Sequence, residues 1–130
     1  MIAGVGLDLA KVERIARALE RHGERFMRRC FTSYERGLCQ SRPGRASAFA
    51  LRFAAKEAFS KAAGLGMNGL GKRGLGWRDI EVVHDTRGKP ELVLHGAALA
   101  WARENGISAS FVSLTDEGDY AAAVVVLEKT

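Results

Sequence analysis

The chain has little of several residue types that would indicate common kinds of site. Its two cysteines, Cys30 and Cys39, form no CxxC pair and lack metal-ligand spacing, which argues against a zinc site and favours reduced thiols. Its three histidines, His22, His84 and His95, are scattered along the chain. They therefore predict neither a metal cluster nor a Ser-His-Asp set.

Long apolar runs are also absent. No stretch approaches the roughly 20 apolar residues that a membrane-spanning helix needs, and the first residues lack the basic start of a signal peptide. We therefore expect a cytoplasmic protein that does not interact with a membrane. The 130 residues are 47% hydrophobic, which predicts one domain, 1–130, with a modest core that would gain from oligomerisation.

Charge is present but uneven. Residues 1–65 contain 13 Lys and Arg against 6 Asp and Glu, whereas residues 66–130 contain 7 against 9. The overall charge of +5 thus belongs to the N-terminal half. A basic surface there is typical of a protein that meets an anionic partner.

The order of sequence patterns predicts an α+β fold in which a mainly antiparallel sheet packs against a long central helix. The predicted strands cover 2–7, 79–84, 91–94, 111–114 and 120–127, with a turn at 116–119. The predicted helices cover 11–21, 24–30, a segment that Thr32 and Glu35 begin as a capping box, the long helix 46–63, and 96–104.

Two carboxylates occupy unusual settings. Asp8 follows the first predicted strand, and Glu57 lies within an Ala- and Phe-rich helix, on the same side as Phe53, Ser60 and Lys61. A surface ion pair between Glu57 and Lys61 would be worth little. Burial beside apolar neighbours would be costly unless a cation receives the carboxylates. The alternatives are thus a simple helix ion pair or a Mg²⁺ site facing a phosphate.

Arginines recur every three or four residues along the first helical region, at positions 14, 17, 21, 25 and 28. On a continuous helix they would fall within an arc of roughly 80°, opposite an apolar side. Two interpretations remain: a solvated face with i,i+4 ion pairs, or a docking face for an acidic partner. Gly23 is expected to interrupt the helix.

The glycine-rich segment 64–76 is expected to be a loop. Gly64 to Gly69 fits GxGxxG, and Gly66 to Lys72 fits GxxxxGK. Both fingerprints need a strand before and a helix after them, and here a helix precedes. Arg73 also stands where a P-loop needs Ser or Thr. We therefore expect no nucleotide fingerprint but a backbone that can approach a phosphate.

Two segments, Val5-Gly6-Leu7-Asp8-Leu9 and Arg52-Phe53-Ala54-Ala55-Lys56-Glu57-Ala58-Phe59-Ser60-Lys61-Ala62, resemble the holo-[acyl-carrier-protein] synthases, the short 4′-phosphopantetheinyl transferases. The resemblance extends over almost the whole chain. It implies Mg²⁺-dependent transfer of 4′-phosphopantetheine from coenzyme A to a serine of apo acyl carrier protein, in fatty acid biosynthesis. The other product is adenosine 3′,5′-bisphosphate.

The resemblance also implies roles for individual residues. Asp8 and Glu57 would hold Mg²⁺, and Lys61 would neutralise the diphosphate, so these three form the expected catalytic set. The expected contacts to coenzyme A are Arg45, Arg52, Lys56, Ser60, Lys61, Gly64 and Thr115. Whether a metal-bound water or Glu57 takes the proton of the serine stays open.

The same resemblance implies a partner for this row of arginines, the arginine stripe, because acyl carrier proteins are acidic. Arg14, Arg17 and Arg21 are the expected contacts. The family is typically a homotrimer with sites between subunits, which implies that residues 113–116 line the site of a neighbour. Asp116 stands where many members have a histidine that contacts the nucleotide.

Two other functions use part of the same evidence. A nucleic-acid-binding domain would explain the basic charge of the N-terminal half. It leaves Asp8 and Glu57 unexplained, so we expect no nucleic acid. A non-catalytic module that binds carrier protein would need only the arginines. Changing Glu57 to Gln separates these hypotheses, because only an enzyme loses turnover while carrier binding survives.

Overall fold

The computed structural model describes residues 1–65 and 76–130. The chain runs β1 (Ile2–Lys11), α1 (Val12–His22), α2 (Glu24–Cys30), α3 (Ser33–Cys39), α4 (Arg45–Ala62), η2 (Trp77–Asp79), β2 (Ile80–His84), β3 (Pro90–Leu94), α5 (Gly96–Glu104), β4 (Ile107–Glu117) and β5 (Tyr120–Lys129). The predicted α+β class is confirmed.

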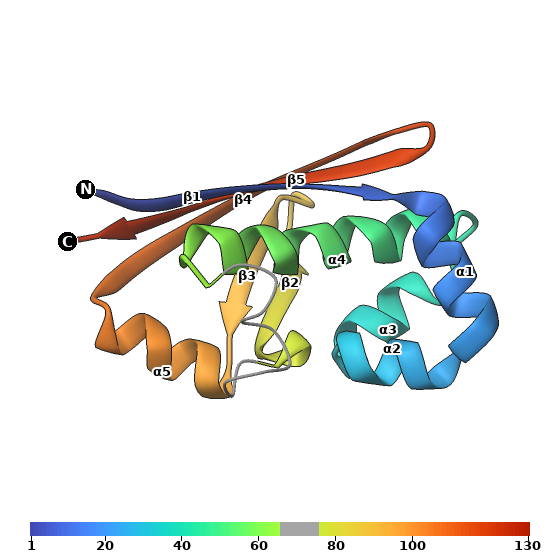
Figure 1. Cartoon of the computed structure of the whole chain (residues 1–130), viewed down its shortest axis with the longest axis horizontal. Helices are drawn as coiled ribbons and strands as arrows, with labels where there is room; N and C mark the ends of the chain where they lie inside the picture. The colour runs from blue at the N-terminus through green and yellow to red at the C-terminus, as the bar shows by residue number, and fades with distance from the viewer. Residues whose placement is uncertain (66–75) are drawn as a thin grey trace.

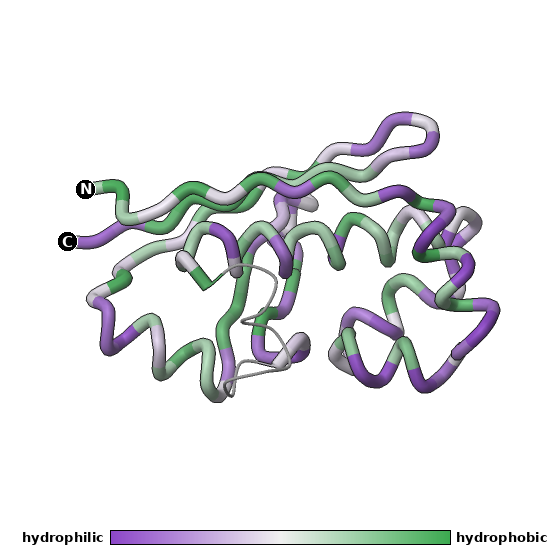
Figure 2. The backbone as a smooth tube through the Cα atoms, viewed as in Figure 1, coloured by the Kyte–Doolittle hydropathy of each residue, from purple (hydrophilic) through white to green (hydrophobic). Residues whose placement is uncertain are grey.

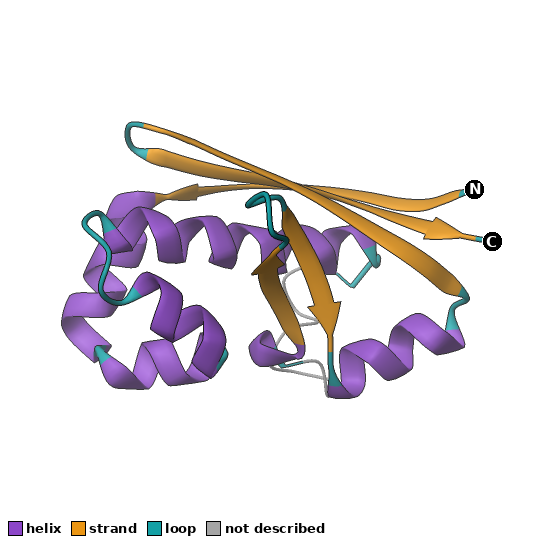
Figure 3. Ribbon diagram, turned by 180° about the vertical axis from the view of Figure 1, so that it is seen from behind, coloured by secondary structure: helices purple, strands orange, loops and turns teal. Residues whose placement is uncertain are grey.

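The strands form two antiparallel sheets. The larger has the order β1-β5-β4, and β2 and β3 make a separate hairpin. Helix α4 lies along one face of the larger sheet, with α1, α2 and α3 gathered near its beginning and α5 beyond its other end (Figure 1). From behind, the β2–β3 hairpin crosses the direction of the long strands (Figure 3).

Helix α4 is the centre of the core because apolar side chains surround it almost completely. Thirteen of its residues are buried, as expected for a helix that is apolar on all sides. Figure 2 shows the hydrophobic stretches of the long strands beside it and the hydrophilic turn between β4 and β5.

Two glycines set the distance between β1 and α4. A Cβ atom at Gly4 would lie 1.9 Å from Ala62 O, and one at Gly6 would lie 1.9 Å from Ala58 O. The helix backbone therefore rests directly on the strand, with no room for a side chain. This contact brings the inward-facing Asp8, two residues after Gly6, to the surface of α4.

Strand β1 is longer than the sequence predicts. It continues past Leu7 because its pairing with β5 runs on to Lys11 opposite Tyr120. Asp8 thus lies inside a strand rather than after one. Strand β4 is longer for the same reason: it pairs with β5 through Glu117, which confines the turn to Gly118 and Asp119.

The predicted helices agree with the structure to within a residue or so. Thr32 and Glu35 form the predicted capping box at the start of α3, and Gly23, with φ of 46°, separates α1 from α2. The predicted glycine-rich loop falls largely on residues 66–75, outside the described residues. In the remainder of the chain, no helix has both the length and the apolar character needed to cross a bilayer.

Both cysteines are free, as the sequence predicts, and both are buried. Burial raises the pKa of the Cys30 thiol to about 11, and it raises the pKa of Cys39 as well. These thiols are therefore protonated at neutral pH and contribute to packing.

Candidate active site

The carboxylates of Asp8 and Glu57 meet between β1 and α4. Their residues are only 6% and 3% exposed. Burial, together with the neighbouring carboxyl group of Asp8, raises the pKa of Glu57 to about 8. The strand and the helix therefore bring together the two acids that the sequence singled out.

One oxygen of each acid lacks a partner. Oδ2 of Asp8 and Oε1 of Glu57 are buried, and neither has a hydrogen bond to any part of the chain that the structure describes. A buried carboxylate oxygen without a partner is costly. Two such oxygens on adjacent acids are the arrangement that a bound cation would satisfy.

Lys61 provides positive charge at the edge of this pair. Its Nζ donates to Asp8 Oδ1 at 3.0 Å and to Leu7 O at 3.1 Å. The side chain is still 41% exposed, so it can reach a ligand from solvent. The expected ion pair with Glu57 along the helix is thus replaced by one with Asp8 across to the strand.

The expectation that Lys56 contacts a phosphate needs correction. Its side chain is 0% exposed, and its ammonium group is bound to Glu35 Oε1 at 2.8 Å and to two backbone carbonyls. Burial also lowers the pKa of Lys56. All three donors of the ammonium group are thus used inside the protein, which leaves none for a phosphate.

Arg52 is buried but incompletely bonded. Its Nη1 donates to Ala48 O at 2.8 Å, whereas its Nε has no partner within residues 1–65 and 76–130. His84 lies nearby: burial lowers its pKa, and the charges of Arg52 and Arg42 lower it further. Sequence reasoning missed Arg42 and His84 as neighbours of Arg52, since no periodicity connects them.

The other residues that we expect to contact coenzyme A lie at several places along α4 and the larger sheet. Ser60 is buried on α4 one turn after Lys56, and Gly64 follows the end of that helix with φ of 78°. Arg45 begins α4 and borders a hollow of about 350 Å³ shared with α1. Glu57 lies twelve positions further along the helix, a rise of about 18 Å.

Thr115 lies on the opposite face of the sheet from Asp8. It pairs with Ala122 in β5, which in turn pairs with Leu9, and it borders a hollow of about 520 Å³ on that outer face. Within one chain, therefore, Thr115 and the two acids are separated by the sheet.

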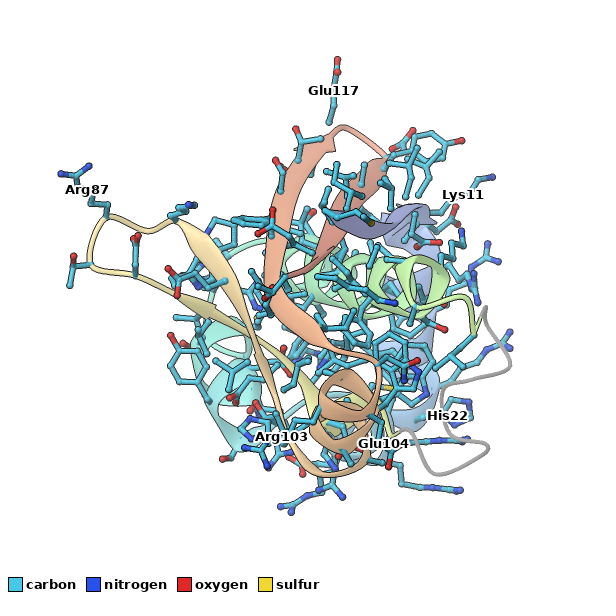
Figure 4. The ribbon with its side chains drawn as sticks, turned by 90° about the vertical axis from the view of Figure 1, so that its left-hand side faces the viewer. Lys11, His22, Arg87, Arg103, Glu104 and Glu117 are labelled. Carbon is cyan, nitrogen blue, oxygen red and sulfur yellow. The ribbon has the colours of Figure 1, made fainter. Side chains whose placement is uncertain are left out.

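The arginines of α1 surround a hollow of about 510 Å³, lined by Lys11, Glu13, Arg14, Arg17, Ala18, Arg21 and His22. Arg17 is paired with Glu13 at 2.8 Å, whereas Arg14 lies 6.0 Å from the ring centre of Phe53. Figure 4 places Lys11 and His22, at either end of α1, on the side of the molecule away from Arg87. The stripe bends at Gly23, as expected.

Comparison with known proteins agrees with this arrangement. The 4′-phosphopantetheinyl transferase superfamily matches residues 4–125. A holo-[acyl-carrier-protein] synthase of Geobacter sulfurreducens is 47% identical over 129 residues, which cover 99% of both chains.

Two solved structures are similar over nearly their whole length. The holo-[acyl-carrier-protein] synthase of Neisseria meningitidis has a TM-score of 0.87 and 39% identity, covering 99% of this chain and 100% of that one. The Helicobacter pylori synthase in complex with coenzyme A has a TM-score of 0.82 and 28% identity, covering 95% and 99%. The chain belongs to the 4′-phosphopantetheinyl transferase superfamily, within its holo-[acyl-carrier-protein] synthase group.

Proposed function

We propose that this protein transfers 4′-phosphopantetheine from coenzyme A to a serine of apo acyl carrier protein, using Mg²⁺ held by Asp8 and Glu57. The observation that carries the proposal is the adjacent pair of buried acids, each with an unpartnered oxygen. Family membership supplies the substrates, because relatives are named for this carrier protein and one was solved with coenzyme A.

The residues fit Mg²⁺ better than a metal that prefers a complete protein cage. Mg²⁺ commonly takes one or two carboxylates and completes its shell with water and substrate phosphates. In the described ranges, no group of three or more His, Cys, Asp or Glu side chains is arranged to hold a metal. When bound, the ion would neutralise charge on the diphosphate of coenzyme A.

In this reaction the protein mainly positions the reactants and neutralises their charge. The serine oxygen forms a bond to the phosphorus next to the pantetheine. The bond from that phosphorus to adenosine 3′,5′-bisphosphate breaks, and the serine proton is released. Lys61 is suited to neutralise the leaving phosphate, because its ammonium group borders the acids and its side chain is 41% exposed.

A second phosphate position is proposed near Arg52. The unpartnered Nε of this buried arginine and the nearby charge of Arg42 make a cationic region. Arg52 has no carboxylate partner among the described ion pairs. Arg45, Ser60, Gly64 and Thr115 stay predictions as contacts to coenzyme A. Lys56 has no part in this set.

Docking of the carrier protein is proposed on α1. Arg14 and Arg21 have no ion pair within the described chain, so their charge is available to an acidic partner. Such a surface would speed encounter and make transfer sensitive to salt. We further propose that the carrier is that of fatty acid biosynthesis and that the reaction takes place in the cytoplasm.

The outer face of the larger sheet supports assembly into a homotrimer. Val5, Leu7, Leu9 and Phe111 are each more than half exposed on it, and a continuous apolar patch of this kind is typical of an interface. Thr115 lies on this same face as Leu9, since both pair with Ala122, so a neighbouring copy seated there would contact it. Light scattering coupled to size-exclusion chromatography would measure the assembly, with three chains expected.

Intact-protein mass spectrometry tests the activity. Apo acyl carrier protein would be incubated with this protein, coenzyme A and Mg²⁺. A Mg²⁺-dependent gain of one phosphopantetheine is expected, and both Asp8→Asn and Glu57→Gln should abolish it while carrier binding persists. If a carrier that another synthase modifies gains no mass, the enzyme hypothesis is wrong and a docking module becomes the better one.

A further inference from the structure

A buried ion pair lies beside the candidate site without taking part in the proposed reaction. Lys56 Nζ is 2.8 Å from Glu35 Oε1, and both side chains are 0% exposed. The Lys56 ammonium also lies 5.5 Å from the ring centre of Phe31. Replacing a buried ion pair by well-packed apolar residues often leaves the stability of a protein unchanged or increases it. Stability alone therefore does not explain why this pair is present.

The pair connects elements that are distant in the sequence. Glu35 Oε1 also accepts from Thr32 N at 2.9 Å, and its Oε2 accepts from Val82 N at 2.9 Å. Lys56 donates to Trp77 O at 3.0 Å and to Ile80 O. One carboxylate and one ammonium group thus attach α4 to the start of α3, to η2 and to β2.

These bonds hold α4 on one side. On another side, the backbone of α4 rests on Gly4 and Gly6 of β1, which fixes the spacing of helix and strand, and Lys61 bonds Asp8 Oδ1 and Leu7 O. Lys56 precedes Glu57, and neighbouring side chains on a helix point about 100° apart. Any rotation of α4 that moves Lys56 therefore moves Glu57 by the same angle relative to Asp8.

We propose that Glu35 and Lys56 are positioning residues, which fix the rotation of α4 so that Glu57 faces Asp8. The inference rests on the proposed function, because it concerns the geometry of the acids that would hold the cation. The pair acts through Glu57 and does not touch substrate.

The test uses a double variant, Glu35→Gln with Lys56→Met, which removes both charges and keeps similar side-chain volumes. Cys39→Ala is the matched control, because it removes a buried side chain from the same helix α3 and leaves both charges in place. Three quantities would be measured on the full-length protein: thermal unfolding, Mn²⁺ affinity by electron paramagnetic resonance with coenzyme A present, and kcat and KM for transfer.

The double variant is expected to unfold at a lower temperature than the unchanged protein, because Trp77 O and Ile80 O lose their donor. Its Mn²⁺ affinity and kcat should each fall by about tenfold or more, as is usual when the groups that orient metal ligands are removed. Its KM for carrier protein should not change. The control should lower the unfolding temperature without changing Mn²⁺ affinity.

Unchanged Mn²⁺ affinity and kcat in the double variant would overturn the inference and leave the pair a purely structural one. If the double variant does not fold, Lys56→Arg decides in the same way, because it keeps the charge but alters the donor geometry and should lower Mn²⁺ affinity. Lack of Mn²⁺ binding by the unchanged protein would contradict the proposed function instead, since the inference concerns only the difference between variant and unchanged protein.

Discussion

Lys61 Nζ lies 3.0 Å from Oδ1 of Asp8, a residue 53 positions earlier in the chain. The pair crosses from α4 to β1 and compensates one of two adjacent buried carboxylates. Glu57, one helical turn before Lys61, keeps a buried oxygen without a partner in the described structure. The charges of Arg14 and Lys61 both lower the pKa of Glu57, but burial and the neighbouring Asp8 outweigh them, which leaves room for a cation.

Replacing Lys61 by Ala should lower kcat about 100-fold or more, the range seen when a charge-stabilising group is removed from a reaction centre. The mass-spectrometric transfer assay at saturating substrate measures it. Lys129→Ala removes an exposed lysine at the end of β5 and should leave kcat unchanged. If Lys61→Ala kept full turnover, the lysine would not neutralise the leaving group.

The stability of the metal-free protein should depend on the pH through Glu57. Its pKa is about 8 in the folded protein and 4.5 ordinarily, so the folded state holds a proton that the unfolded state releases between these values. The free energy of unfolding should therefore fall as the pH rises from about 5 to 8. Glu57→Gln should flatten that slope.

Thermal unfolding at several pH values without divalent cations measures this slope for both proteins. Because Mg²⁺ competes with the same proton, its apparent affinity should rise as the pH approaches 8. Equal slopes in the two proteins would show that Glu57 titrates normally and is not held against Asp8.

Gly6→Ala should both destabilise the protein and disturb the site. The added Cβ would lie 1.9 Å from Ala58 O, a backbone atom that cannot move without shifting the packed helix. We therefore expect the free energy of unfolding to fall by about 3 kcal/mol. Turnover should fall as well, because α4 carries Glu57 away from β1.

Gly37→Ala is the matched control for this substitution. Gly37 lies within α3 and has no atom within 4 Å of an added Cβ. Alanine there should stabilise the helix by about 1 kcal/mol. Chemical denaturation measures both variants, and equal effects would mean that β1 and α4 do not touch at Gly6.

These relationships divide between what the sequence predicts and what it does not. The capping box of Thr32 and Glu35, the long helix and the pairing of Asp8 with Glu57 follow from local patterns and the family resemblance. The fate of Lys56 does not, because a helix that is apolar all round gives no periodicity to say which side a lysine faces. Its partner Glu35 is 21 positions away, a contact that only tertiary packing decides.

The sequence underestimates the length of β1 for a similar reason. Asp8 has a low intrinsic preference for strands, and the predicted strand ends at Leu7, just before it. The ladder with β5 continues past it, and the acid is accepted because it faces α4 and Lys61 rather than apolar side chains. The residue that departs from ordinary strand preference is thus one of the two acids of the candidate site.

The arginines of α1 should not contribute equally to carrier docking. Arg17 is already paired with Glu13 at 2.8 Å, whereas Arg21 has no described ion pair. We expect Arg21→Ala to raise KM for carrier protein about tenfold, corresponding to about 1.4 kcal/mol, with kcat unchanged. Arg17→Ala should raise KM less. Steady-state kinetics at low and high salt measure both, and a change in kcat rather than KM would contradict a docking role.

The most direct test of the metal site is anomalous diffraction from crystals grown with Mn²⁺ and coenzyme A. The predicted result is one anomalous peak within coordination distance of an oxygen of Asp8 and an oxygen of Glu57, next to the diphosphate. A peak elsewhere, or coenzyme A bound with both acids free of metal at saturating Mn²⁺, would contradict the assignment of Asp8 and Glu57 as the cation ligands.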